Sequence, residues 1–491
     1  MAWTPETLRA TIRQRLSDGL FVVVSNREPY IHRFEGEELL CEMPASGLTI
    51  AVDPVMQACG GTRVAHGSGD ADRRVVDAQD HVPVPPERPS YTLRRVWLTK
   101  EEEAGYYYGF ANEALWPLCH IAYTRPVFNE LDWATYGAVN RKFAEAVLEE
   151  IGSRHAFVFI QDYHFALLSR LLKRPNIHTA QFWHIPWPNS EAFQICPWAE
   201  ELLDGLLGND LLGFHILYHC QNFISTAERT IEALIDYERS AITRGGSTTL
   251  VRPFPISVDT ETIATHATSP EVAAEMKRLK RRYGLGNQLV GLGVDRIDYT
   301  KGIPERFRAL DRFFERYPEF QGRLVFVEIG VPSRVHIDAY QRVNDEIDEA
   351  IERINWTYQR EAWKPILYLK EHVSPTTLRA WYRLANFCAV TPLHDGMNLV
   401  AKEFVASRTD EQGVLLLSRF TGAARELTEA LLVNPYATDQ LAHAIHQALT
   451  MSPDERQRRM RKLRSAIHAQ DIYHWAGSVL STLFQFEFQE T

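Results

Sequence analysis

The sequence predicts an α/β protein built from two domains, each with a doubly wound parallel sheet. The first supporting observation is length, because 491 residues exceed the roughly 250–300 at which a single core stops growing. The second is that short runs apolar on both faces alternate with longer segments of helical periodicity, which is typical of buried parallel strands covered by helices. The third is a break in this alternation at residues 251–263, where two prolines interrupt a strand-like piece.

The expected strands form two series. Those of the first half are 21–26, 156–161, 179–184 and 211–214, and those of the second half are 289–294, 324–329, 366–369, 387–391 and 414–418. The expected domains are residues 1–258 and 259–470, followed by a helix in 471–491 that packs back on the first domain. Ligands of doubly wound domains bind at the carboxyl ends of the strands, so we expect an active-site cleft between the two domains.

Composition excludes several classes of function. Lys and Arg number 53 against 63 Asp and Glu, and the net charge of −10 argues against general binding to nucleic acid or an anionic membrane. No segment approaches the ~18 consecutive apolar residues of a membrane span, and the first residues lack the apolar core of a secretory signal. The six cysteines form no C-x-x-C pair and are expected as free thiols in a reducing compartment. We therefore expect a cytoplasmic protein.

The segment "VTPLHDGMNLVAKEFVASR", residues 390–408, predicts a strand end, a tight turn and a helix. A helix start presents unpaired N–H groups and the positive end of the helix dipole, which together suit a phosphate. Gly396 would let the backbone approach a ligand closely, while Asp395 and Glu403, the latter two turns along, could accept hydrogen bonds from sugar hydroxyls. The alternative is a capped surface helix in which Asp395 is only the cap.

The segment "GVDRIDYTKGIPERFRAL", residues 293–310, places two cations on one loop after a strand. Arg296 and Lys301 are five residues apart, so both side chains could converge on one diphosphate, the first as a planar fork and the second as a point charge. The alternative is a pair of solvated loop cations.

Polar residues also follow the expected strands of the first half. Asp162 and His184 stand where α/β folds keep their chemistry, although either could be structural. Arg27 ends the first strand, and the small pair Ser46-Gly47 opens a helix in a way that suits an anion.

His215 and His219 have the spacing of metal ligands on one helix face. No third ligand of the right kind is close in sequence. We therefore favour a structural role for this pair and expect no metal site.

From "VVVSNR" to "YHWAGSVL" nearly the whole chain resembles trehalose-6-phosphate synthases, which are retaining glycosyltransferases of family 20 with a GT-B fold of two facing Rossmann-like domains. The matching blocks include "QDYHF", "HIPWP", "VDRIDYTKGIPERF", "PSR" and "TPLHDGMNLVAKE". The resemblance implies transfer of glucose from a nucleotide sugar, UDP-glucose above all, to glucose 6-phosphate, without a cofactor or metal. The products would be trehalose 6-phosphate and the nucleoside diphosphate.

The resemblance also implies roles for individual residues. The residues that would bind the donor are Gly47, Asp395, Gly396, Met397, Asn398, Leu399, Val400 and Glu403. Binding of the phosphorylated acceptor falls to Arg27, Tyr107, Trp116 and Arg334. The catalytic residues would be Arg296 and Lys301, which hold the diphosphate, Asp162, which orients acceptor hydroxyls, and His184, which contacts the donor glucose.

Three departures from the family pattern bear on the substrates. Ser46 replaces a glycine of the closing loop, His394 replaces an arginine, and His66 or a neighbour stands where a tryptophan commonly lines the acceptor phosphate. The last leaves the acceptor open, so a synthase that glucosylates glycerol 3-phosphate is an alternative. A second alternative is a non-catalytic relative that only binds sugar phosphates. The base of the donor is also open, and a homo-oligomer is a fair expectation.

Overall fold

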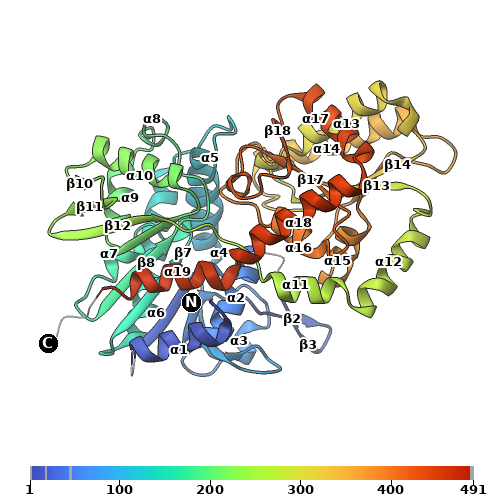
Figure 1. Cartoon of the computed structure of the whole chain (residues 1–491). Coiled ribbons are helices and arrows are strands. Elements are labelled where there is room, and N and C mark those ends of the chain that lie inside the picture. The colour runs from blue at the N-terminus through green and yellow to red at the C-terminus, as the bar shows by residue number, and fades with distance from the viewer. Residues whose placement is uncertain (1–2, 17–18, 44–46, 487–491) are drawn as a thin grey trace. The chain divides into compact units, whose positions relative to one another are not determined.

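The computed structural model describes residues 3–16, 19–43 and 47–486. The chain divides into two compact units (Figure 1). Unit 1 comprises Met1–Ile256 and Ile472–Thr491, and unit 2 comprises Ser257–Asp471. Unit 1 is therefore made from two separate stretches of the chain.

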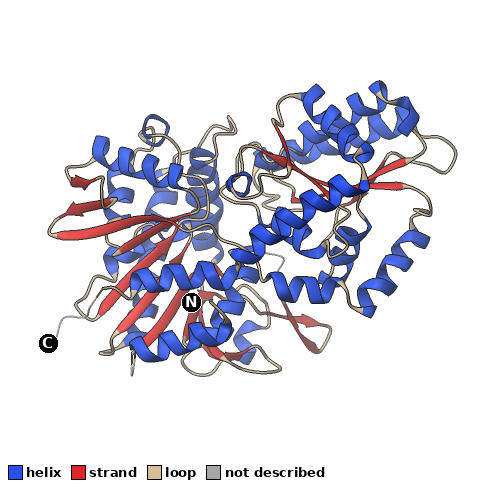
Figure 2. Cartoon of the chain, in the orientation of Figure 1, coloured by secondary structure: helices blue, strands red, loops and turns tan. Residues whose placement is uncertain are grey.

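Unit 1 is built on a ten-stranded sheet whose centre is parallel (Figure 2). The strand order is β10 (Leu234–Asp236), β11 (Ala241–Arg244), β12 (Ser247–Pro253), β9 (Leu211–Phe214), β8 (Ile177–Phe182), β7 (Ala156–Gln161), β1 (Leu20–Arg27), β4 (Thr62–His66), β6 (Tyr91–Val96) and β5 (His81–Val84). All pairs from β12 to β6 are parallel, and the antiparallel pairs lie at the two edges. Every residue of β7 is buried, as expected of a strand covered on both faces.

Helices and a small hairpin complete unit 1. The hairpin is β2 (Ile31–Glu35) and β3 (Glu38–Glu42). The longer helices are α1 (Pro5–Leu16), α2 (Gly47–Cys59), the π-helix η1 (Ala104–Leu115), α6 (Glu130–Ile151), α9 (Ala199–Leu206), α10 (Leu217–Thr230) and α19 (Ile472–Leu483). The short ones are α3 (Asp72–Val75), α4 (Lys100–Glu103), α5 (Trp116–Cys119), η2 (Tyr163–Phe165), α7 (Leu168–Leu171) and α8 (Ser190–Phe193).

Unit 2 has a six-stranded sheet in which every pair is parallel. The order is β15 (Ile366–Leu369), β14 (Leu324–Val331), β13 (Leu289–Arg296), β16 (Phe387–Val390), β17 (Val414–Ser418) and β18 (Leu431–Val433). Its helices are α11 (Thr260–Ala267), α12 (Pro270–Arg282), η3 (Tyr299–Lys301), α13 (Ile303–Arg316), η4 (Pro318–Phe320), α14 (Asp338–Tyr358), α15 (Pro375–Leu384), α16 (Leu399–Ser407), η5 (Gly422–Arg425), α17 (Thr438–Thr450) and α18 (Pro453–Ala469).

Local sequence explains where several of these helices begin. Helices α12, α15 and α18 each start with Ser-Pro, in which the serine hydroxyl accepts from the third helical N–H and proline takes the first helical position. The apolar stripe of α13, which includes Phe307, Leu310 and Phe314, is fully buried against the sheet and α14 and α17.

The doubly wound α/β prediction is confirmed in both units. The strands β7, β9, β15 and β17 have the predicted bounds, whereas β8 begins and ends two residues earlier than predicted. The pattern missed β4 and β6. Each carries an arginine that is almost completely buried, Arg63 in β4 and Arg95 in β6, and such a residue interrupts the apolar run by which a strand is recognised.

Among the described residues, no helix combines the length and the apolar character that a membrane crossing requires. All six cysteines lie in the described part of the chain and are free thiols.

Helix α19 packs against the sheet of unit 1, beside β8 and β9 (Figure 1). The ring of Trp475 lies 5.7 Å from that of Phe159 and 5.2 Å from that of Phe182, centroid to centroid. A side chain at Gly477 would collide with Trp3, which precedes α1, and α19 also contacts α1 itself. The last helix therefore contributes to the core of unit 1.

The Trp475→Ala variant is expected to lower the free energy of unfolding of unit 1 by about 3–5 kcal/mol, because a large buried ring is replaced by a cavity. Urea unfolding monitored by circular dichroism measures the change. Trp356 on α14 is 82% exposed and gives a matched control, with an expected change for Trp356→Ala within about 0.5 kcal/mol. Equal effects of the two substitutions would contradict this account of α19.

Candidate active site

The residues singled out from the sequence lie at the carboxyl ends of strands in both units. Those of unit 1 are Arg27 at the end of β1, Asp162 after β7 and His184 after β8, together with Tyr107 on η1 and Trp116 on α5. Those of unit 2 are Arg296 at the end of β13, Lys301 on η3, Arg334 after β14, Asp395 to Asn398 after β16, and Leu399, Val400 and Glu403 on α16. Parallel strands bring such residues together at one edge of each sheet.

In unit 2 a lysine and an aspartate from two different strand exits form an ion pair. Nζ of Lys301 lies 2.6 Å from Oδ2 of Asp395, and both side chains are mostly buried. The same oxygen accepts from the side-chain amide of Asn398 at 3.2 Å. The alternative in which Asp395 is merely a helix cap is wrong, because the cap of α16 is Asn398, whose Oδ1 accepts from the N–H of Ala401 at 3.2 Å.

The start of α16 has the geometry of an anion-binding site. Asn398 has a φ of 87°, and the helix begins at the next residue. By helix geometry the N–H groups of Leu399 and Val400 have no acceptor within the helix. Met397 is buried, and its carbonyl accepts from the N–H of Ala423, which fixes the turn. The free end of this helix therefore lies directly beside the Lys301–Asp395 pair.

Glu403 lies nearer to the helix start than predicted. Because α16 begins at Leu399 instead of directly after Gly396, Glu403 is just over one turn along, not two. Its Oε2 lies 3.3 Å from Nη1 of Arg379 and accepts from the hydroxyl of Tyr382 at 3.2 Å.

Asp298 joins two of the predicted cationic residues. Its buried Oδ2 lies 3.5 Å from Nη1 of Arg334 and 4.0 Å from Nη2 of Arg296. Burial alone would raise the pKa of Asp298, but Arg334, Arg296 and Lys301 together hold it below its usual value. The carboxylate is therefore ionised, and it allows two guanidinium groups to share one small region.

Two backbone features shape this edge of unit 2. Gly302 has a φ of 63°, and a Cβ there would lie 2.2 Å from the carbonyl oxygen of Thr391, so only glycine fits between Lys301 and α13. Arg334 has a φ of 49° without being glycine, and its guanidinium contacts the hydroxyl of Tyr340. Such strain persists only where the surrounding structure enforces it.

Arg306 on α13 supports this edge of the sheet and was missed in the sequence analysis. Its Nη1 donates to both oxygens of Glu328 at 2.9 and 2.8 Å, its Nη2 donates to Asp295 at 2.7 Å, and its Nε donates to Thr391 at 3.0 Å. Through these bonds Arg306, which is fully buried, connects the carboxyl ends of β13 and β16 to the middle of β14. Arg306 lies among the buried apolar residues of α13, but the sequence alone does not separate such a position from a surface one.

In unit 1 Asp162 is held in an unusual conformation. Its φ is 73° and its ψ is 176°, and its Oδ1 accepts from the N–H groups of Tyr163 at 3.0 Å and His184 at 3.2 Å. The carboxylate thus links the carboxyl ends of β7 and β8.

His184 is neutral at pH 7, because burial, with smaller effects of His215 and His164, holds its pKa well below the usual value. Its Nε2 lies 3.0 Å from Oε1 of Gln161. The expected helical pair of His215 and His219 is wrong, since His215 precedes α10, and its Nε2 lies 3.0 Å from the carbonyl oxygen of His184. In the described ranges, no three His, Cys, Asp or Glu residues group in a way that could hold a metal ion.

Arg27 is exposed, and its Nη2 donates to the hydroxyl of Tyr107 at 3.0 Å. Tyr107 comes from the π-helix η1, whose wide turns are often found at functional sites. Trp116 follows on α5, where its ring lies 4.1 Å from that of His120. The three predicted acceptor residues of unit 1 thus lie on β1, η1 and α5.

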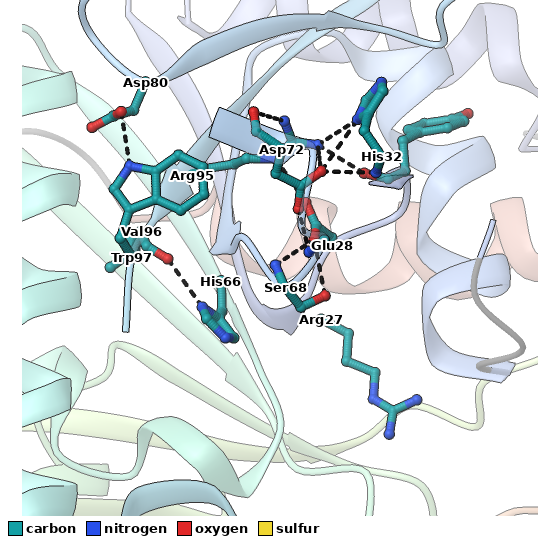
Figure 3. Close-up of polar contacts among 12 residues, drawn as sticks. Arg27, Glu28, His32, His66, Ser68, Asp72, Asp80, Arg95, Val96 and Trp97 are labelled. Atoms are coloured by element: carbon teal, nitrogen blue, oxygen red, sulfur yellow. Dashed lines mark hydrogen bonds and ion pairs between the residues drawn. The ribbon is translucent and has the colours of Figure 1, made fainter. Parts of the chain in front are cut away.

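His66 lies beside Arg27 in the sheet, where the two residues are partners in the register of β1 and β4. Its Nδ1 lies 3.1 Å from the carbonyl oxygen of Val96 (Figure 3). Because a carbonyl only accepts, Nδ1 carries a proton, and Nε2 is the nitrogen that remains for a ligand.

The other two departures from the family pattern are Ser46 and His394. Gly47 is the first residue of α2, while Ser46 lies outside the described residues. Burial lowers the pKa of His394 against the opposing effect of Asp395, so that this imidazole is neutral where an arginine would be charged.

Two doubly wound units, with cations and a free helix start at the strand ends, define a glycosyltransferase of the GT-B fold class. The chain belongs to glycosyltransferase family 20, whose sequence profile matches residues 19–485. It is 37% identical over 480 residues to a trehalose-6-phosphate synthase of Mycolicibacterium vanbaalenii, covering 94% of this chain and 95% of that protein. It is also 37% identical to a bifunctional trehalose-6-phosphate synthase/phosphatase of Thermoproteus tenax, of which it spans 63% of the length.

Solved structures agree with this assignment. A structure from E. coli bound with UDP-2-fluoro glucose superposes with a TM-score of 0.85 at 32% identity and covers 96% of this chain and 100% of that one. An α,α-trehalose-phosphate synthase (UDP-forming) from Burkholderia xenovorans in complex with glucose 6-phosphate gives a TM-score of 0.84 at 31% identity, over 94% and 99% of the two chains. The predicted resemblance and the predicted fold class are confirmed.

The Arg306→Met variant is expected to lower the free energy of unfolding by about 3–5 kcal/mol, because it leaves two buried carboxyl groups without the cation that they share. Urea unfolding at pH 7.5, about three pH units above the usual carboxyl pKa, measures the loss. Arg308 lies on the same helix and pairs with Glu305 and Glu346 at the surface, so Arg308→Met should cost less than about 1 kcal/mol. A loss for Arg306→Met as small as that of the control would show that the triad is not a support.

Proposed function

We propose that this protein transfers glucose from UDP-glucose to glucose 6-phosphate with retention of configuration, giving trehalose 6-phosphate and UDP. The relatives named above are trehalose-6-phosphate synthases, and two of the similar structures hold a UDP-glucose analogue or glucose 6-phosphate. The observation that supports the proposal is the Lys301–Asp395 pair beside the start of α16, because a cation, a carboxylate and helix-start amide donors lie together there.

Unit 2 would bind the sugar nucleotide. Arg296, Lys301 and the N–H groups of Leu399 and Val400 would hold the diphosphate, while Asp395 would accept hydrogen bonds from glucose hydroxyls. The contacts that Glu403 makes with Arg379 and Tyr382 both use Oε2, so Oε1 is the oxygen that we assign to the ribose hydroxyls.

Unit 1 would bind the phosphorylated acceptor. Arg27 would grip the phosphate, with Tyr107 and Trp116 beside it, and Asp162 would orient the acceptor hydroxyls. His184, which is neutral, would contact the donor glucose without adding charge at the reacting carbon. We keep the predicted role of Gly47 in the loop that closes over the donor. We also keep the predicted role of Arg334 in binding the acceptor phosphate.

The acceptor hydroxyl oxygen would form its bond to the anomeric carbon on the face from which the diphosphate departs. As the bond between that carbon and the diphosphate breaks, a phosphate oxygen takes the proton of the incoming hydroxyl. Negative charge grows on the leaving diphosphate, and Arg296, Lys301 and the helix-start amides would stabilise it. Holding both substrates in position supplies a further part of the rate enhancement.

The remaining expectations are unchanged. The six free thiols suit the reducing cytoplasm, which we keep as the predicted location. The net charge of −10 gives no reason to expect nucleic acid or a membrane among the partners, and a homo-oligomer remains a prediction.

Incubation of the protein with UDP-, ADP- or GDP-glucose against glucose 6-phosphate or glycerol 3-phosphate tests the proposal. We expect the fastest reaction with UDP-glucose and glucose 6-phosphate and an α,α-linked product by NMR. Preferred use of glycerol 3-phosphate would replace the proposed acceptor, and no transfer with any pair would refute the proposal.

The Lys301→Ala variant is expected to lose about 10²–10³ in kcat, because a cation that stabilises the leaving diphosphate is removed. Steady-state assays with both substrates saturating measure the loss. Lys370→Ala is a matched control, since Lys370 pairs with Asp348 at the surface, and its kcat should remain within about twofold. Near-normal turnover of the Lys301 variant would remove this residue from the mechanism.

A further inference from the structure

Four buried ionisable side chains lie next to Arg27 and take no part in the proposed mechanism. We call Glu28, His32, Asp72 and Arg95 the Glu28 cluster (Figure 3). Each is at most 4% exposed. They come from the segment after β1, from β2, from α3 and from β6, so the cluster ties together four parts of unit 1.

Arg95 bonds to both carboxyl groups of the cluster. Its Nε donates to Oε2 of Glu28 at 2.8 Å, and its Nη2 lies 2.8 Å from Oδ1 of Asp72. Nη2 also lies 2.8 Å from Nδ1 of His32. The same Nδ1 lies 3.3 Å from Oδ1 of Asp72, and the backbone N–H of His32 donates to that oxygen at 2.8 Å. The cluster therefore holds two carboxyl groups beside one guanidinium, which is always charged.

An unmatched buried charge is costly, so one of the two carboxyl groups keeps a proton. Burial raises the pKa of Glu28 to about 8, the hydrogen bond with Asp72 adds to this effect, and Arg95 opposes it. Although burial would also raise the pKa of Asp72, hydrogen bonds from His32 and Glu28 lower it to about 2. Near neutral pH Glu28 is therefore the protonated partner and donates to Asp72.

Cys41 on β3 is a further titratable group that interacts electrostatically with Glu28, Asp72 and Arg95. Burial raises the pKa of this thiol above its usual value, so it stays neutral while Glu28 ionises. Loss of the Glu28 proton thus makes the charge of the cluster more negative by one.

Glu28 connects the exits of two neighbouring strands. It follows Arg27 directly, and its Oε1 accepts from the N–H of Ser68 at 2.7 Å and from the Ser68 hydroxyl at 3.0 Å. Ser68 stands two residues after His66, the register partner of Arg27. Figure 3 shows the Arg27 side chain extending away from the cluster, so the cluster holds the backbone from which this guanidinium projects.

We propose that protonated Glu28 is a positioning residue for the acceptor-phosphate site. In this form it fixes the backbone of Arg27 and the segment after β4. Its deprotonation weakens binding of the phosphorylated acceptor, because two buried carboxylates then repel and displace the backbone from which the Arg27 side chain projects (Figure 3). This inference rests on the proposed function, which places the phosphate on Arg27.

The test is the pH dependence of KM for glucose 6-phosphate and, separately, for UDP-glucose, between about pH 6.5 and 9.5. In the wild type we expect the acceptor KM to rise roughly fivefold to tenfold as pH passes through about 8, with the donor KM unchanged over the same step. In Glu28→Gln, which cannot ionise, the step in acceptor KM should vanish even if KM itself is altered. In Asp72→Asn the step should move to lower pH, because the group that keeps Glu28 protonated is gone.

Glu150→Gln is a matched control. Glu150 is a mostly buried carboxylate of unit 1 bonded to Thr62 and His81, away from the cluster, and its variant should keep the wild-type step. A step that persists in Glu28→Gln, or one that appears equally in the donor KM, would overturn the proposal.

Infrared difference spectroscopy gives a readout that does not depend on turnover. The wild type at pH 7, about one pH unit below the Glu28 pKa, should show the carbonyl stretch of protonated buried carboxyls, to which Glu328, with a pKa raised by burial to about 7, also contributes. The part of this band that belongs to Glu28 should be lost in Glu28→Gln, and an unchanged band in that variant would also overturn the proposal. If the protein uses no phosphorylated acceptor, the proposed function fails. The role of Glu28 can then still be tested by measuring the binding of inorganic phosphate by calorimetry over the same pH range. A loss of affinity near pH 8 in the wild type that is absent in Glu28→Gln would support the role, and equal behaviour of the two proteins would reject it.

Discussion

A buried arginine that must be matched by carboxylates anchors the strand exits of each unit. Arg95 does this in unit 1 with Glu28 and Asp72, and Arg306 does it in unit 2 with Asp295 and Glu328. A guanidinium can reach several partners at fixed angles, so each one joins segments that apolar packing alone would leave free to shift. Removing these charged groups from water costs free energy, and only well-aligned hydrogen bonds offset that cost. Rigid strand exits are what a site made of loop residues requires.

The same balance of charge governs the candidate donor site. A protein with a net charge of −10 does not attract an anion through its overall field, so local cations have to do so. In unit 2 these cations are already paired, Lys301 with Asp395 and Arg334 with Asp298. A ligand therefore competes with carboxylates of the protein. A diphosphate-linked sugar suits such a site, because its phosphates can take over the cation while its hydroxyls satisfy the released carboxylate of Asp395.

The features that could be predicted from the sequence are those that follow from apolar periodicity and from the position directly after a strand. It placed β7 and β15 correctly, and it selected Lys301 and Asp395, 94 residues apart, which the structure brings to 2.6 Å. It missed Arg95 and Arg306, because a buried charged residue has no pattern that separates it from a surface one. It also missed the π-helix η1 and the positive φ of Arg334, since these are imposed by tertiary contacts. The roles assigned to the site residues come from the resemblance and stay predictions.

Because the chain returns to unit 1 in α19, unit 1 cannot be completed before unit 2 has been synthesised. Residues 257–471 stand between two stretches of unit 1, so unit 2 is an insertion in topological terms. Its strands and helices are contiguous in sequence and can assemble as they leave the ribosome. The sheet of unit 1, although most of it is synthesised first, receives Trp475 only after unit 2 is complete. The half of the protein that is made first is thus the half that finishes last.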